Sequence, residues 1–100
     1  MRIAWIGGLD RNERALTDLA AARGHTLMFH CGDVRGRGAE ELKALIRRCD
    51  LAVVVTSVNS HGGVQFAKKF ARQAGRPVVI SRSGSSSMLD QLLSDQSRVA

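Results

Sequence analysis

The sequence is short of the residues and runs that define several large protein classes. It contains two cysteines, too few for a disulfide framework, so we expect both thiols to be reduced. No apolar run approaches the roughly 20 residues that span a bilayer. The opening MRIAWIGG is too short for a signal peptide, because Gly7 and Gly8 interrupt it. Together these absences predict a cytoplasmic protein with no membrane segment.

Aromatic residues are also scarce, since the chain has no tyrosine, one tryptophan and three phenylalanines. With no recognised reading motif either, this scarcity disfavours nucleic acid as a partner. The formal charge is +6, from 15 Lys and Arg against 9 Asp and Glu. We therefore expect an anionic partner such as phosphate, a carboxylate or an acidic protein, although a solvated basic surface would explain the same charge.

One hundred residues predict a single domain, with a core over about 2–94 and a frayed tail after Ser94. Short apolar runs predict strands at 2–6, 26–30, 51–56 and 77–81. Apolar residues at helical spacing predict helices at about 10–23, 39–49, 64–74 and 87–94.

Strands that alternate with helices predict a parallel sheet with helices on both faces. We therefore expect one small three-layer α/β/α sandwich with a four-stranded parallel sheet, of the flavodoxin-like or Rossmann-like kind. Asp10 with Glu13 resembles a capping box that opens the first helix, and Ser87 with Asp90 resembles one that opens the last.

Ligands in such folds bind beyond the carboxyl ends of the strands, so the loops at this end are the predicted site. These loops read GGLDR, HCGDVRGR, TSVNSH and SRSGSSS, and they bring His30, Cys31 and His61 to one end of the sheet. His25 begins a strand and Cys49 precedes one, so we expect both at the opposite end.

The stretch FHCGDVRGRG has the outline of a cysteine-phosphatase phosphate loop. Cys31 would be the nucleophile and Arg37 would clamp the phosphate, with a helix N-terminus behind them. Asp33 counts against this hypothesis because it would repel a dianion, and Asp10 is the available candidate for the general acid. In the simpler interpretation, Cys31 packs as a small apolar residue and the glycines form turns.

A dinucleotide-binding site and a metabolite-binding site are two further alternatives. GGLDRNE lacks the GxGxxG spacing, which disfavours a dinucleotide site. The second is a regulatory domain that binds a small anionic metabolite through SRSGSSS and the adjacent helix N-terminus. Such a domain would have no catalytic residues. The sequence favours a binding protein over an enzyme without excluding the phosphatase-like alternative.

With all four loops in view, the chain resembles the bacterial family catalogued as domain of unknown function 2325. The resemblance runs from about Ile3 to Leu93 and rests on IGGLDRNE, FHCGD, LAVVVTSVNSH and GRPVVISRSGSSSMLDQL, in that order. The chain departs from the family pattern at Leu9, where many relatives carry histidine, and at Cys31, where we expect aspartate. The second departure argues against a phosphate loop shared by the family.

The resemblance implies a haem-binding protein, which needs an axial ligand, an apolar slot and cations for the propionates. His30 is then the preferred axial ligand, and His61 is the second ligand or a distal hydrogen-bond donor. Cys31 is less favoured than His30, because adjacent strand-end residues point to opposite faces. A backbone-bonded His30 and a helix-terminal His61 are the structural alternatives.

The same resemblance indicates where the rest of the haem would be held. The apolar walls would come from Leu9, Val58, Met88 and Leu89. The propionates would pair with Arg11, Arg35, Arg37 and Arg82. A chain of this size cannot easily enclose haem alone, so we expect a homodimer with haem near its interface. Its role would be to sense or carry a diatomic gas, or haem itself.

Overall fold

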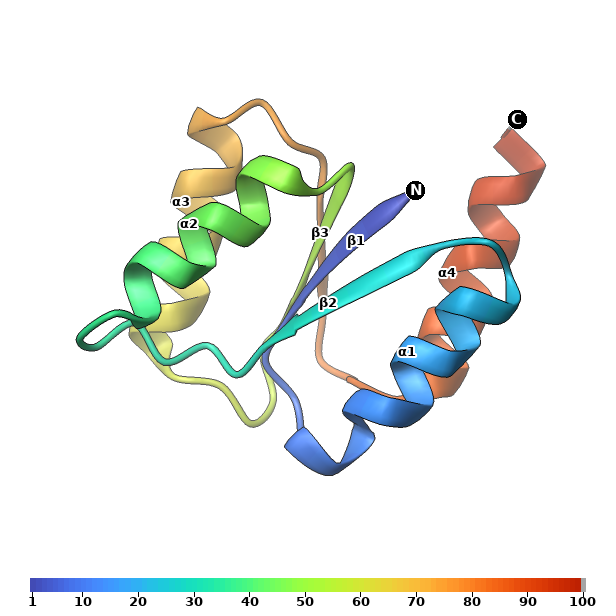
Figure 1. Ribbon diagram of the computed structural model, residues 1–100, viewed down its shortest axis with the longest axis horizontal. Coiled ribbons are helices and arrows are strands. Elements are labelled where there is room, and N and C mark those ends of the chain that lie inside the picture. Colours follow the sequence, from blue (N-terminus) through green and yellow to red (C-terminus); the bar gives the residue numbers. More distant parts are fainter. Residues whose placement is uncertain (100) are drawn as a thin grey trace.

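The computed structural model describes residues 1–99, with side chains described for residues 1–95. Its centre is a parallel sheet in the order β2-β1-β3-β4 (Figure 1). The strands are β1 (Arg2–Ile6), β2 (Thr26–His30), β3 (Leu51–Val55) and β4 (Val78–Ser81). Each strand begins and ends within one residue of its predicted bounds, so the predicted four-stranded parallel sheet is confirmed.

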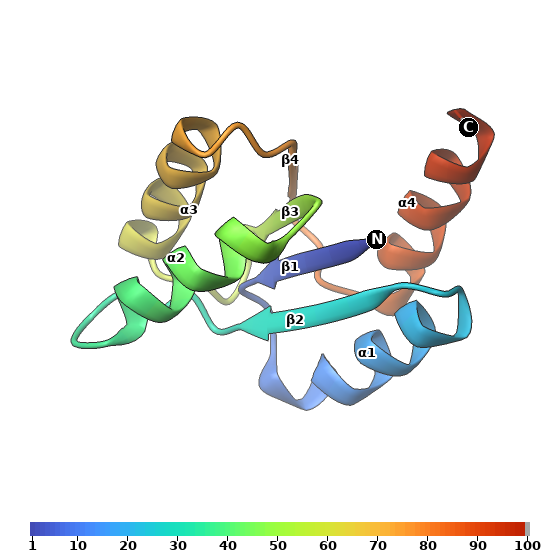
Figure 2. The ribbon, with the colours of Figure 1, turned by 45° about the horizontal axis from the view of Figure 1, so that its top comes forward.

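Helices cover both faces of the sheet, as Figures 1 and 2 show. After a 3-10 turn, η1 (Asp10–Asn12), the helices are α1 (Glu13–Ala22), α2 (Gly38–Arg48), α3 (His61–Gln73) and α4 (Ser86–Val99). α1 packs beside α4 on one face, and α2 packs beside α3 on the other. This arrangement confirms the predicted three-layer α/β/α sandwich. None of the described helices has the length and apolar character that crossing a bilayer requires.

Alternation along β1 divides the core into two clusters. Ile3 and Trp5 face α1 and α4, whereas Ala4 and Ile6 face α2 and α3. All four side chains are fully buried. β3 is buried along its whole length, because strands flank it on both sides and helices cover both of its faces. This position explains why its sequence, LAVVV, is apolar without alternation.

Two helix starts differ from the sequence prediction. The Asp10–Glu13 capping box is absent, because Asp10 begins η1 and the N-cap residue of α1, Asn12, makes no side-chain cap hydrogen bond. In α4 the hydroxyl of Ser85 accepts a hydrogen bond from a first-turn N–H at 3.3 Å. Ser85 therefore has the capping role that the sequence assigned to Ser87.

The last helix is longer than the sequence predicts. α4 continues to Val99, whereas the sequence predicts a frayed tail after Ser94. Leu93 packs in the core, so the helix is still anchored to the sheet at the point where the sequence predicted its end. Residue 100 lies outside the described part of the chain.

The amino ends of the strands hold the two residues that the sequence excluded from the site. His25 Nδ1 lies 2.7 Å from the N-terminal amino group of Met1. Cys49 is fully buried, and its thiol donates to the carbonyl of Ile46 at 3.2 Å. Burial raises the pKa of the Cys49 thiol, so this cysteine stays protonated and unreactive. Both predicted positions are confirmed.

Asp50 ties the start of β1 to the start of β3. The backbone N–H of Arg2 donates to Asp50 Oδ2 at 2.7 Å, and Nε of Arg2 lies 3.8 Å from the same oxygen. These contacts, chiefly the backbone hydrogen bond, hold the pKa of the Asp50 carboxyl below its ordinary value of 3.8. Because the folded-state pKa is depressed, the carboxylate stabilises the fold above the ordinary value, and this contribution is lost as the pH falls through the folded-state pKa.

We therefore expect the Asp50→Asn variant to be less stable than the wild type at neutral pH and to approach it in acid. Urea unfolding of both proteins at about pH 7 and about pH 3 measures the difference in the free energy of unfolding. A difference that stays constant with pH would contradict the assignment of this effect to the ionised carboxylate.

Candidate functional site

The strand order creates a crevice at the carboxyl ends of β1 and β3. The chain leaves β1 for α1 on one face of the sheet and leaves β3 for α3 on the other, so the two loops diverge here. The N–H of Gly8 donates to the carbonyl of Val58 at 3.1 Å, which joins the two loops across the crevice. All four predicted loops lie at this end, as four parallel strands require.

Asn59 lies at the centre of these loops. Its Nδ2 donates to the carbonyl of Val55 at 2.8 Å and to that of Ile6 at 3.4 Å, so one amide joins the ends of β3 and β1. A Cβ atom at Gly7 or at Gly32 would overlap the Asn59 side chain. The glycines of the first two loops are therefore required to make room for it. Our sequence analysis missed Asn59, although an asparagine after a buried strand, opposite glycine-rich loops, was the available signal.

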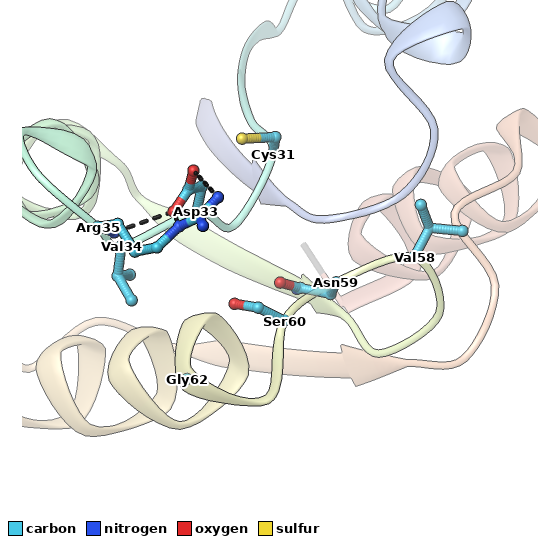
Figure 3. A pocket seen from close by; sticks show the side chains of 8 residues that line it. All are labelled: Cys31, Asp33, Val34, Arg35, Val58, Asn59, Ser60 and Gly62. Atoms are coloured by element: carbon cyan, nitrogen blue, oxygen red, sulfur yellow. Dashed lines mark hydrogen bonds and ion pairs between the residues drawn. The ribbon is translucent and has the colours of Figure 1, made fainter.

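The side-chain oxygen of Asn59 is a buried hydrogen-bond acceptor. Asn59 Oδ1 has no hydrogen-bond partner among the described residues. Figure 3 shows this oxygen directed toward the loop between β2 and α2. An unsatisfied buried acceptor costs free energy, so this atom is suited to receive a hydrogen bond from a bound molecule or a water.

An open groove of about 490 Å³ lies between the β2–α2 loop and the β3–α3 loop. Its lining residues, drawn in Figure 3, are Cys31, Asp33, Val34, Arg35, Val58, Asn59, Ser60 and Gly62. The hydroxyl of Ser60 donates to the carbonyl of Gly32 at 3.0 Å and accepts from the N–H of Gly63 at 2.8 Å. Ser60 therefore caps α3 and fixes the two walls of the groove relative to each other.

His30 is held by backbone groups on both ring nitrogens. The N–H of Gly32 donates to His30 Nδ1 at 2.9 Å, so Nε2 carries the proton and donates to the carbonyl of Gly38 at 3.1 Å. The residue is 8% exposed. Neither nitrogen is open to iron in this arrangement. The geometry matches the structural alternative for His30 and does not support its preferred role as an axial ligand.

Cys31, the next residue, is exposed and lines the groove (Figure 3). The two neighbours thus have opposite environments, as the alternation of side chains at a strand end predicts.

The β2–α2 loop does not present a ring of free N–H groups to a phosphate. The N–H of Gly32 is engaged by His30, that of Arg35 donates to Asp33 Oδ1 at 2.9 Å, and that of Gly38 donates to a loop carbonyl. Nε of Arg35 also donates to Asp33 Oδ1 at 3.0 Å. This pairing lowers the pKa of the Asp33 carboxyl, so Asp33 is ionised and forms a neutral ion pair with Arg35 on the groove wall.

The other phosphatase candidates are apart from Cys31. Arg37 is exposed at the N-cap position of α2 and does not line the groove. Asp10 lies in η1 and, with Arg11, lines a different groove along α1. The geometry therefore does not support a cysteine-phosphatase site.

The remaining predicted haem contacts are divided between the surface and the core. Leu9 and Val58 are exposed at the carboxyl end of the sheet, by 37% and 58%, and Val58 has a φ of +48° that β-branched residues rarely adopt. Leu89 is fully buried, and Met88 packs against the same core cluster, so neither is an open wall. Arg82 is exposed in the loop that follows β4.

His61 is the first residue of α3, next to the groove residues Ser60 and Gly62. It is exposed, and the described part of the chain makes no hydrogen bond to its ring. Among residues 1–95, no group of three or more His, Cys, Asp or Glu side chains could hold a metal ion by itself.

Comparison with known proteins identifies relatives over nearly the whole chain. A family model described as "Uncharacterized protein conserved in bacteria (DUF2325)" matches residues 2–96. A UPF0751 protein of Desulfitobacterium hafniense (strain DSM 10664 / DCB-2) is 31% identical over 94 residues, which cover 92% of each chain. A UPF0751 protein of Bacillus cereus (strain AH820) is 29% identical over 77 residues, 77% of this chain and 76% of the relative. No solved structure matches the chain significantly.

The close approach of Gly32 to Asn59 can be tested with alanine substitutions. Gly32 and Gly36 both have positive φ, at +92° and +56°, but only at Gly32 would a Cβ meet the Asn59 side chain. We expect Gly32→Ala to lower the free energy of unfolding by about 1–3 kcal/mol more than Gly36→Ala. Chemical denaturation measures both, and equal losses would contradict the packing described for Asn59.

The two cysteines should differ in reactivity. We expect a thiol reagent such as Ellman's reagent to modify Cys31 in the folded protein and Cys49 only after unfolding, because Cys31 is exposed and Cys49 is buried. The Cys31→Ser variant is the control, and its folded form should not react. Rapid modification of both cysteines in the folded wild type would contradict the burial of Cys49.

Proposed function

We propose that this chain, which belongs to the bacterial family DUF2325, is a haem-binding protein whose haem lies along the groove between the β2–α2 and β3–α3 loops. The observation that carries the proposal is the exposed thiol of Cys31 on the wall of an open groove that also presents Val34 and Val58. A thiolate is an established axial ligand of haem iron, and the apolar side chains offer contact for the ring.

The axial ligand proposed here differs from the one that the sequence favoured. His30 is engaged on both nitrogens, whereas Cys31 is exposed and lines the groove. His61, exposed beside the groove, is the second ligand or the distal hydrogen-bond donor. Asn59 Oδ1 adds a buried acceptor between the walls. When bound, haem would supply an iron that takes a diatomic gas.

The propionates require cations that are not already paired. Arg35 is engaged by Asp33, and Arg11 lines another groove. Arg37 and Arg82 are exposed in loops at the carboxyl end of the sheet, so they are the proposed partners. Each exposed pair contributes about 0.2–1 kcal/mol, so these arginines orient the haem more than they hold it.

The openness of the groove supports the proposal of a homodimer. A ring bound along one wall would keep much of its apolar surface in water, and a second copy of the chain would cover it. Exposure of Cys31 requires a reducing compartment if the thiol is to stay available, which supports a cytoplasmic location. The proposed role is to sense or carry a diatomic gas, or haem.

A second candidate function is binding of a small anionic metabolite in the same groove. α3 begins there, and the hydroxyl of Ser60 satisfies the N–H of Gly63, which leaves the first N–H groups of the helix for an anion. The serines of SRSGSSS are less suitable, because Ser83 donates to Ser85 at 3.0 Å and Ser81 to the carbonyl of Ser83. Asp33 and Arg35 form a neutral ion pair on the groove wall, so this wall adds no net attraction for an anion.

Titration of the purified protein with hemin tests the proposal. For the wild type we expect a saturable Soret band at one haem per chain or per dimer. The band should be altered in Cys31→Ser and in His61→Ala. Loss of an axial ligand should lower the affinity for haem at least about tenfold. His25→Ala, at the opposite end of the sheet, is the matched control and should bind as the wild type does. Unsaturable binding that ignores both substitutions would refute haem binding, and stabilisation by inorganic phosphate alone would favour the second candidate.

A further inference from the structure

The β4 edge of the sheet is open. β4 pairs with β3 on one side, and no described strand pairs with it on the other. Its four residues include no buried side chain, and Ile80 is 52% exposed. β2, the opposite edge, buries Leu27 and His30 to 6% and 8% exposure. The two edges therefore differ: β2 has two buried side chains, whereas β4 has none and carries an exposed large apolar side chain, Ile80.

The backbone of β4 has hydrogen-bonding groups that face outward. The N–H of Ala52 donates to the carbonyl of Pro77 at 2.9 Å, and that of Thr56 donates to the carbonyl of Ser81 at 2.8 Å. Since alternate residues of a strand bond to opposite sides, the N–H and C=O groups of Val78 and Ile80 point away from β3. Flavodoxin-like sheets in the order 2-1-3-4-5 have another strand at this position.

A basic groove runs beside this edge on the α3 face. It has a volume of about 260 Å³ and is lined by Lys68, Arg72, Arg76, Val78 and Ile80. None of its three cations forms an ion pair with an acidic side chain of the described residues, and no acidic residue lines the groove. Arg76 donates to the carbonyl of Arg47 through Nη2, but its buried Nε has no acceptor among the described residues.

The three cations beside β4 favour an acidic strand over a second copy of this chain as the partner of the edge. A second copy that paired its own β4 in antiparallel fashion would place its α3 on the same side of the joined sheet. The two sets of cations from Lys68, Arg72 and Arg76 would then face each other across the junction, which is unfavourable. An acidic strand at the same place would be attracted to these cations.

We propose that β4 binds an extended acidic segment of another protein as an additional strand. The backbone of the segment would pair with the outward groups of Val78 and Ile80. Its Glu or Asp side chains on the α3 face would lie beside Lys68 and Arg72, with their methylene groups against Ile80. This surface shares no lining residue with the groove that contains Cys31, so the inference is independent of haem binding.

The test uses a capped synthetic peptide of about eight residues that alternates Glu with Val and Thr, and a version with Lys in place of Glu. Amide NMR spectra of the full chain follow the titration. We expect saturable binding of the Glu peptide, with the largest shifts at Val78 and Ile80, and no binding of the Lys peptide. Binding should weaken as salt is raised, because the pairs are exposed.

Two lysines of α3 make a matched pair of variants. Lys68 lines the groove beside β4, whereas Lys69 lines a different groove with Phe66 and Phe70. We expect Lys68→Glu to weaken binding of the Glu peptide by about three- to tenfold and Lys69→Glu to leave it unchanged. Equal effects of the two substitutions would overturn the proposal, since they would show attraction to net charge alone.

A third variant tests the backbone pairing. Ile80→Pro removes an outward N–H at an edge position, so it should abolish binding while the bonds of β4 to β3 remain. Unaltered binding in this variant, or no binding of the Glu peptide to the wild type, would overturn the proposal. Protection of the Val78 and Ile80 amides that rises with protein concentration in the absence of peptide and of haem would overturn the proposal in favour of a second copy paired at β4; a dimer that leaves these amides unprotected is the one proposed at the other groove and does not bear on β4.

Discussion

The carboxyl end of the sheet depends on one side-chain amide. Asn59 donates to carbonyls at the ends of β3 and β1, and glycines in the first two loops allow it to lie between them. Every loop that lines the groove is positioned directly or indirectly by this contact, because Ser60, the next residue, ties the β2–α2 loop to the start of α3. The oxygen of the same side chain has no hydrogen-bond partner within the part of the chain that the structure describes. The residue that organises the site is therefore also a group that a ligand could engage.

The fold was predictable because short apolar runs mark the strands and apolar residues at helical spacing mark the helices, and both signals are local in the sequence. LAVVV reads as a buried central strand, and the structure gives it neighbours on both sides. VVIS is also an apolar run and was predicted as a strand, but Ile80 is exposed because no described strand follows β4 in the sheet. Burial of a strand depends on what lies next to it, and a run of apolar residues does not encode that.

The sequence could not show which side chains of the site are free to bind a ligand, because their freedom depends on hydrogen bonds between close neighbours. His30 and Cys31 are adjacent, and the sequence favoured the imidazole over the thiol. A positive φ at Gly32 turns its N–H back onto His30 and removes the imidazole from the site, while Cys31 lines the groove. Similarly, Arg35 reads as a free cation, but Asp33 two residues earlier engages it.

The proposed haem site is the groove beside Asn59. Chemical-shift mapping with gallium protoporphyrin, a diamagnetic analogue of haem, tests it most directly, because it places the ligand without relying on any substitution. We expect the perturbed amides to cluster at residues 31–35 and 58–62, on the two walls of the groove. Perturbations that centre on the α1 surface or along β4 would contradict it.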